Sequence, residues 1–182
     1  SDKMKIINTK LPNVLILKPN VFGDNRGIFK EIYQINEYAK AGINYKFVQD
    51  NYSRSNKGVL RGLHFQKKKP QGKLVSCLFG AVYDVVVDVN PNSATFGKYI
   101  GIELSCENHY QLWIPPGYAH GFCVLSDTAD FYYKCTDYYD KEDEYGIAWN
   151  DKDLCIKWPT NRPKISRKDE MLPSFKYLKE MF

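Results

Sequence analysis

The feature that most restricts the fold is a series of short β-rich segments in which apolar and polar residues alternate. Glycine, proline, asparagine and aspartate separate them, as in KPN at 18–20 and NPNS at 90–93. Many short strands divided by turns favour a sandwich or a barrel. The segments are residues 13–17, 27–33, 46–53, 58–65, 74–80, 82–89, 98–104, 110–114, 121–125, 129–135 and 145–149.

Helical patterns are confined to two short stretches. Residues 35–42 would form one helix, ended by Gly42, and residues 166–172 another, with Ser166 suited to its N-cap. A length of 182 residues with 43% hydrophobic content is enough for one core. We therefore expect an all-β fold with short peripheral helices and a single domain over residues 4–182. The three residues before Met4 resemble a cloning remnant.

Composition argues against several classes of protein. The five cysteines are an odd number without a C-x-x-C pair, which disfavours a disulfide framework or a thiolate zinc site and fits a reducing cytosol. Neither a membrane-spanning apolar run nor a signal peptide is visible. The net charge is +5, but the basic residues are interleaved with acidic ones along the chain. They form no continuous basic stripe that would indicate a nucleic-acid partner. We expect a cytoplasmic protein without a membrane or nucleic-acid partner, which could bind a small phosphorylated ligand.

The histidines are the first candidates for catalytic residues, since imidazole suits proton transfer near neutral pH. His120 stands where a loop enters the strand at 121–125, whereas His64 lies inside the segment GVLRGLHF. Strict alternation places His64 and Arg61 on opposite faces, but a bulge at Gly62 would let both reach one cavity. Spacing alone leaves His64 either catalytic or a hydrogen-bonded structural histidine.

Several longer motifs carry a resemblance to a known family. RGLHFQ, QGKLV, VYDVVVDVNPNSATFGKYIGIEL, QLWIPPGYAHGF, FYYKCTDYY and AWNDKDLCIKWP follow one another as in the dTDP-4-dehydrorhamnose 3,5-epimerase family, which the chain resembles from about Ile6 to Leu172. The resemblance implies a cupin double-stranded β-helix, or jelly roll, that forms a homodimer. It also implies a nucleotide-linked 4-keto-6-deoxy sugar as substrate and no cofactor.

The reaction of such an enzyme requires few groups. Carbons 3 and 5 flank the ketone, so a base can remove either proton and an acid on the opposite face can return one. By the resemblance His64 is the base, Tyr133 the opposing donor and Lys73 the cation that stabilises the enolate. Without the family resemblance, Lys73 could equally be a solvated loop residue, and Tyr133 could be an aromatic residue of the core or of an interface. Alternation places Tyr133 on the face of Phe131, opposite Tyr132.

Asp169 has two interpretations that the sequence leaves open. The resemblance pairs it with His64, whose tautomer it would fix. The spacing S-x-x-D equally matches a capping box, in which its carboxylate would bond the amide of Ser166. Asp84 and Asp88 share a face of a valine-rich strand, and their role is likewise open between support of the site and a polar edge.

The resemblance also indicates the residues that bind the nucleotide and sugar. Arginine and lysine suit the diphosphate, and amides and carboxylates suit the edge of a pyrimidine. Tyr139 could stack on the base or serve only in packing. The indicated residues are Arg26, Glu31, Gln49, Asn51, Arg61, His120, Tyr139, Glu144 and Lys168.

One departure from the general cupin pattern bears on metal binding. His64 is followed by Lys73 where metal-binding cupins present two closely spaced histidines and a glutamate. We therefore expect no metal, which disfavours a cupin dioxygenase, and the missing H-x-H pair disfavours a ketoisomerase. The sequence predicts an epimerase acting on carbons 3 and 5 of a dTDP-linked keto sugar. An epimerase for a GDP-linked keto-heptose or for one carbon, and a non-catalytic binding module, are the alternatives.

Overall fold

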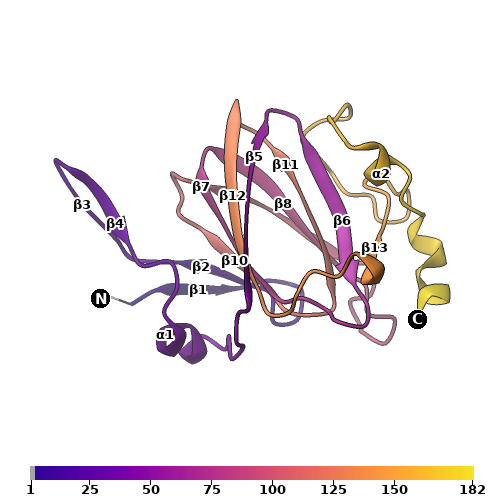
Figure 1. Ribbon diagram of the computed structural model, residues 1–182, viewed down its shortest axis with the longest axis horizontal. Coiled ribbons are helices and arrows are strands. Elements are labelled where there is room, and N and C mark those ends of the chain that lie inside the picture. Colours follow the sequence, from indigo (N-terminus) through magenta and orange to yellow (C-terminus); the bar gives the residue numbers. More distant parts are fainter. Residues whose placement is uncertain (1–2) are drawn as a thin grey trace.

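Two antiparallel sheets form the centre of the fold, which a computed structural model describes for residues 3–182 (Figure 1). In the first sheet the strands lie in the order β1-β2-β10-β7-β12-β5. Their bounds are β1 Lys5–Asn8, β2 Leu15–Lys18, β10 Gln111–Ile114, β7 Lys73–Phe79, β12 Thr128–Cys135 and β5 Gln49–Asn56. The second sheet has the order β13-β6-β11-β8-β9. Its strands are β13 Glu144–Gly146, β6 Leu60–Gln66, β11 Tyr118–Val124, β8 Ala81–Asp88 and β9 Tyr99–Ser105.

The alternation seen in the sequence fills the space between the sheets. Val75 and Phe131 of the six-stranded sheet join Val86 and Phe122 of the five-stranded sheet in one buried apolar cluster. Burial of this kind contributes about 25 cal/mol for each Å² of apolar surface removed from water. The all-β jelly-roll fold expected from the sequence is therefore confirmed.

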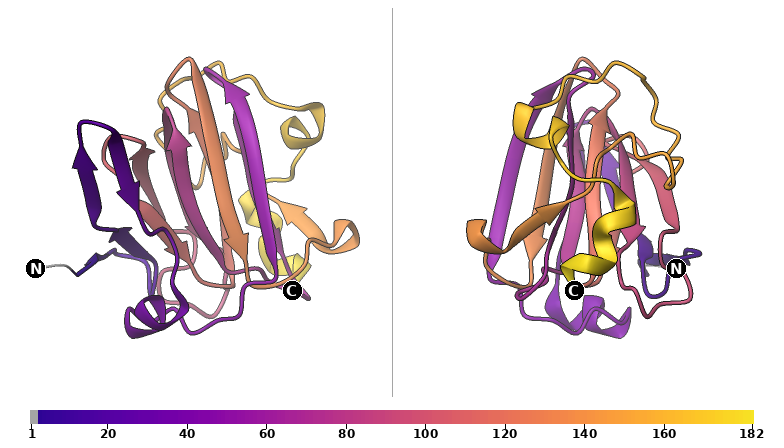
Figure 2. Two further views of the ribbon diagram at one scale, coloured as in Figure 1. Left: turned by 60° about the vertical axis from the view of Figure 1, so that its left-hand side comes forward. Right: turned by 90° about the vertical axis from the view of Figure 1, so that its right-hand side faces the viewer.

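The remaining elements lie around the two sheets. A hairpin of β3 (Val21–Asp24) and β4 (Gly27–Lys30) projects from the sheets on the side away from the C-terminus (Figures 1 and 2). The helix α1 (Ile35–Lys40) is followed by Gly42 at a φ of 101°, as the helix-ending glycine predicted. The short helix α2 (Arg167–Glu170) follows its N-cap Ser166. Two 3₁₀ helices complete the fold, η1 at Lys141–Asp143 and η2 at Phe175–Met181.

The cysteines and the helices bear on two expectations from composition. All five cysteines are free, and Cys77, Cys123 and Cys135 are buried. Among residues 3–182 no helix is both long and apolar enough to cross a bilayer. Of the three residues interpreted as a cloning remnant, Ser1 and Asp2 lie outside the described residues.

Candidate active site

A cavity of about 340 Å³ takes its lining from both sheets and from the segment around α2. His64 enters it from β6 of the five-stranded sheet, whereas Tyr133 and Lys73 enter from β12 and β7 of the six-stranded sheet. This volume falls at the lower end of the range usual for small-molecule sites. An imidazole from one sheet thus faces a phenol and an amine from the other across one cavity.

The position of His64 depends on an irregularity in β6. The register against β11 runs from His120 opposite His64 to Phe122 opposite Arg61, so β6 holds one residue more than its partner. Gly62 lies at this bulge with a φ of 123°, and a Cβ there would be 2.7 Å from the Cα of Gly121. Only glycine fits both the backbone conformation and this close approach. The bulge inferred from the sequence is confirmed, and Arg61 and His64 line the same cavity.

Asp169 completes a pair with His64. Its Oδ1 lies 2.6 Å from Nε2 of His64, and its Oδ2 accepts a hydrogen bond of 3.1 Å from the backbone N–H of Gly62. Burial alone would raise the pKa of Asp169, but the hydrogen bond and charge of His64 hold it below its usual value. Ser166 caps α2 by accepting a bond from the backbone N–H of Asp169, so the cap does not use the carboxylate. The reciprocal capping box is absent, and the carboxylate is committed to the histidine.

Tyr133 and Lys73 stand together on the other wall. The Nζ of Lys73 lies 5.5 Å from the ring centre of Tyr133, and Asn51 stands opposite Tyr133 on the adjacent strand β5. Burial raises the pKa of Tyr133, which keeps the phenol protonated at neutral pH, and burial lowers the pKa of Lys73. Among residues 3–182 no carboxylate lies within ion-pair distance of Lys73. Phe131 joins Tyr133 at the core, while Tyr132 bonds Asp50 at the surface, as alternation predicted.

His120 forms a second histidine–carboxylate pair deeper in the fold. Its Nε2 lies 2.5 Å from Oδ1 of Asp84, and both side chains are buried. Burial lowers the pKa of His120, although the charge of Asp84 acts in the opposite direction. The other oxygen of Asp84 is buried without a hydrogen-bond partner among the described residues. Asp84, whose role the sequence left open, therefore supports a residue that lines the cavity, whereas Asp88 binds Ser93 and Thr95 in a turn.

Polar residues expected to bind substrate surround the opening. Asn51, Arg61, Glu144 and Lys168 all line the cavity. Lys168 forms an ion pair with Glu144, and this bond raises the pKa of Lys168. Tyr139 and Gln49 lie just outside the lining. Burial and the carboxylate of Glu144 raise the pKa of Tyr139, and the backbone N–H of Tyr139 donates to Oε1 of Gln49.

Two expected binding residues are not near this cavity. Arg26 lies at the tip of the β3–β4 hairpin, where it forms an exposed ion pair with Asp24. Glu31 follows β4 and borders a separate hollow beside α1. The hairpin extends away from the strands that carry His64 and Tyr133 (Figure 2). Within one copy of the chain, the structure does not bring Arg26 and Glu31 to the other predicted site residues.

Some residues that shape the cavity were missed by sequence reasoning. Ser53 and Phe122 line it, and Ser55 accepts two hydrogen bonds from the guanidinium of Arg61. Ser53 and Ser55 share a face of β5 with Asn51, so alternation from Asn51 was the available signal.

Residues 3–182 contain no group of three or more histidine, cysteine or acidic side chains placed to hold a metal ion.

Comparisons with known proteins agree with this arrangement. Residues 8–177 match the profile of the family described as dTDP-4-dehydrorhamnose 3,5-epimerase. The Shigella flexneri protein of that name is 54% identical over 168 residues, which are 91% of this chain and 93% of that protein. A Legionella pneumophila dTDP-6-deoxy-D-glucose-3,5-epimerase, solved with dTDP-4-keto-L-rhamnose, has a TM-score of 0.93 and 51% identity, covering 95% of this chain and 93% of that chain. A dTDP-4-dehydrorhamnose 3-epimerase from Streptomyces niveus is 36% identical over 92% of this chain and 82% of that protein.

Proposed function

The chain belongs to the dTDP-4-dehydrorhamnose 3,5-epimerase family, and from this premise we propose that it converts dTDP-4-dehydro-6-deoxy-glucose into dTDP-4-dehydro-rhamnose. The observation that supports this most is the placement of His64 and Tyr133. They enter one cavity from opposite sheets, as a base and an acid on the two sides of a sugar ring must. The reaction is then an inversion at carbons 3 and 5 without oxidation or reduction.

His64 is the proposed base. With Nε2–H donated to Asp169, the lone pair resides on Nδ1, which accepts a proton from carbon 3 or carbon 5. The electron pair of the broken C–H bond moves into the ketone and gives an enolate. Asp169 also stabilises the imidazolium that forms, so the carboxylate acts throughout the step.

Lys73 and Tyr133 complete the inversion from the opposite wall. The Lys73 ammonium stabilises the enolate oxygen in a cavity with little water, where a charge acts more strongly than in bulk solvent. Tyr133 donates its phenolic proton to the other face of the carbon, and its raised pKa keeps that proton available. The second carbon is inverted by the same sequence after the phenol and imidazole exchange protons with solvent.

The cavity opening suits a nucleoside diphosphate. Arg61 and Lys168 carry the positive charge for phosphates, and Asn51 and Glu144 offer partners for the pyrimidine and ribose. Tyr139 lies outside the lining and is 48% exposed, which leaves its ring free to stack on a base that extends beyond the cavity. Gln49 and His120 are proposed to contact the substrate from the rim and the interior respectively.

The working form is proposed to be a homodimer. The β3–β4 hairpin exposes Phe22, Ile28 and Phe29 by 56%, 62% and 70%, a concentration of apolar surface unusual for a monomer. A second copy that covers this hairpin would bring Arg26 and Glu31 to a cavity they do not reach in their own chain. A mixed dimer of His64→Asn and Arg26→Ala subunits should then regain activity, because one of its two sites is intact. Failure of mixing to restore activity would contradict the shared site.

Other features support a simple organisation. Residues 4–182 are proposed to form one domain, since residues from both sheets share a buried apolar cluster. Five free thiols support a reducing compartment such as the cytoplasm. Catalysis is proposed to proceed without a metal or cofactor, because His64, Tyr133 and Lys73 supply the base, the acid and the positive charge.

One experiment separates the proposal from its alternatives. Incubation with dTDP-4-dehydro-6-deoxy-glucose in heavy water, followed by proton NMR, should show loss of both H3 and H5 signals and a product of rhamnose configuration. Exchange at carbon 3 alone would identify a single-carbon epimerase. If deuterium exchange occurs only with a GDP-linked keto-heptose, that sugar is the substrate instead. Binding of the dTDP-linked sugar without any exchange would identify a non-catalytic binding module.

A further inference from the structure

Two crossings between the sheets run beside the cavity. Residues 67–72 lead from β6, which carries His64, to β7, which begins at Lys73. Residues 136–143 lead from β12, which carries Tyr133, to β13, which begins at Glu144. Each crossing joins the five-stranded sheet to the six-stranded sheet. The spacing between base and acid therefore depends on how these two crossings are held together.

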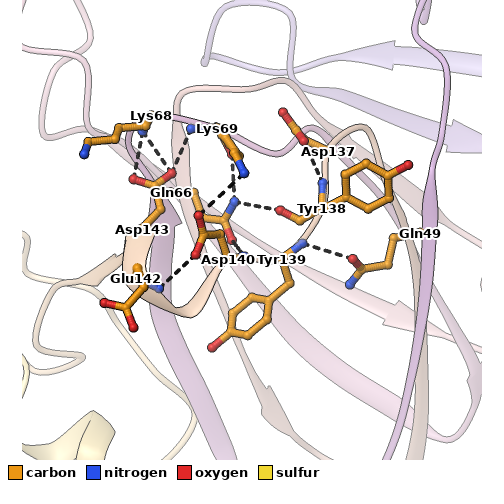
Figure 3. Close-up of polar contacts among 10 residues, drawn as sticks. All are labelled: Gln49, Gln66, Lys68, Lys69, Asp137, Tyr138, Tyr139, Asp140, Glu142 and Asp143. Carbon is orange, nitrogen blue, oxygen red and sulfur yellow. Dashed lines mark hydrogen bonds and ion pairs between the residues drawn. The ribbon is translucent and has the colours of Figure 1, made fainter.

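Gln66, the last residue of the RGLHFQ motif, links both crossings with its side-chain amide (Figure 3). Its Nε2 donates to the carbonyl of Lys69 at 2.8 Å and to that of Tyr138 at 3.1 Å. Its Oε1 accepts from the backbone N–H of Asp140 at 2.9 Å. The side chain is buried, and both N–H donors and the oxygen of its amide are hydrogen-bonded within the chain.

Asp143 makes the second link. Its buried carboxylate accepts the backbone N–H groups of Lys68, at 2.9 Å to each oxygen, and of Lys69, at 2.7 Å. Burial would raise the pKa of Asp143, but these backbone bonds hold it below its usual value. The lysine-rich crossing thus binds a carboxylate through its main chain, while the side chains of Lys68 and Lys69 lie largely exposed.

Further bonds continue this link as far as Lys73. The backbone N–H of Gly72 donates to Oγ1 of Thr136 at 2.7 Å, and the N–H of Thr136 donates back to the carbonyl of Gly72 at 2.9 Å. Nε2 of Gln71 donates to the carbonyl of Asp137 at 2.9 Å. We call the bonds made by Gln66, Gln71, Thr136 and Asp143 the crossover clamp.

We infer that Gln66 and Asp143 are positioning residues, which through the crossover clamp fix the separation of the His64 wall from the Tyr133 wall. This rests on the proposed function, because only a proton transfer across the sugar ring needs that separation. A displacement of about 1 Å between reacting groups can lower a rate on the order of 10². The clamp also holds the segment of Tyr139, which is proposed to bind the base, so KM is not specific to the separation of the walls. The ratio of inversion to exchange is specific to it, because only inversion needs groups on both walls.

Gln66→Met and Asp143→Asn test the inference at two places in the clamp. The first removes all three amide bonds at similar side-chain length, and the second removes the charge that holds the lysine-rich crossing. Asp88→Asn is the matched control, since Asp88 is a buried carboxylate that holds the turn after β8 through Asn90, Ser93 and Thr95 but does not line the cavity.

Turnover, KM and the ratio of inversion to deuterium exchange are measured for each folded variant in heavy water. Both clamp variants should lose about 10-fold or more in kcat, and their inversion-to-exchange ratio should fall. Asp88→Asn should keep the wild-type kcat and ratio even where its melting temperature drops equally. Wild-type kcat and ratio in the clamp variants would overturn the inference.

A failure of the proposed function remains distinguishable. Wild-type protein that exchanges neither H3 nor H5 would reject the function, and the clamp is then judged from ring NMR signals of His64 and Tyr133. These signals should shift in Gln66→Met and Asp143→Asn but not in Asp88→Asn. Unchanged signals in both clamp variants would overturn the positioning role by itself.

Discussion

Replacing Asp169 with asparagine tests how the carboxylate controls His64. Asp169 accepts bonds from both Nε2–H of His64 and the N–H of Gly62. An asparagine amide has one oxygen and one NH₂ group, so it can accept only one of them. Gly62 N–H is a fixed donor, whereas the imidazole proton can move to the other nitrogen. The asparagine oxygen should therefore turn to Gly62, and its NH₂ group should place the ring proton on Nδ1, where the base needs a lone pair.

The magnitude follows from the loss of the correct tautomer. In the serine-protease template the equivalent change lowers turnover about 10⁴-fold, and general-base catalysis contributes about 10²- to 10⁴-fold. Asp169→Asn should therefore lower kcat by about 10²- to 10⁴-fold. The Ser166 cap survives, since it uses the backbone N–H of residue 169, and the loss of stability should stay below about 2 kcal/mol.

Stability should also depend on pH in a defined direction. Because the native pKa of Asp169 is lowered, its carboxylate stabilises the fold above its ordinary pKa, and this contribution is lost as pH falls through the native value. The stability difference between wild type and Asp169→Asn should shrink from pH 7 toward pH 3. Thermal unfolding across that range measures it.

The assay for turnover is NMR-detected exchange and inversion in heavy water. Gln34→Ala serves as control, since it removes the side-chain cap of α1, which is not part of the cavity lining. It should lose about 0.5–2 kcal/mol of stability and keep its turnover. A kcat for Asp169→Asn within about threefold of wild type would refute the tautomer argument.

The remaining predictions concern the other groups of the site. His64→Asn should abolish deuterium incorporation at both carbons by NMR, and exchange at the wild-type rate would make His64 structural. Lys73→Met should lower kcat by about 10²- to 10³-fold, the scale of one lost oxyanion partner, and wild-type kcat would remove Lys73 from the mechanism. Exhaustive EDTA treatment should leave activity intact, whereas loss of activity restored by zinc, manganese or iron would contradict the metal-free site.

Most of the strand pattern could be predicted because alternation and turn residues are local signals. Residues 58–65 and 129–135 fall on β6 and β12, close to their observed bounds. The exposed strands β1 and β3 were not predicted, because neither carries a buried alternate face. The tail after Pro173 gave no signal, yet it forms η2, which buries Leu178.

Local sequence signals do not predict the contacts of the site that join residues far apart in the chain. The bulge at Gly62 could be inferred from a single glycine, whereas the pairing of Asp169 with His64 could be predicted only through the family resemblance, because the two residues lie 105 positions apart in the chain. The bond between His120 and Asp84, which joins β11 to β8, was not predicted. A resemblance names residues without placing them in space, and Arg26, which it assigns to the substrate, does not line the cavity of its own chain.

Tyr133→Phe, assayed in heavy water, tests whether Tyr133 returns a proton to the face of the sugar opposite His64. The ring and its packing are kept, so the fold should persist. His64 should still exchange protons on its own face, and deuterium should enter recovered substrate with retention. Inverted product should fall by about 10²- to 10⁴-fold. An inversion-to-exchange ratio equal to that of wild type would contradict the two-sided site and make Tyr133 a packing residue.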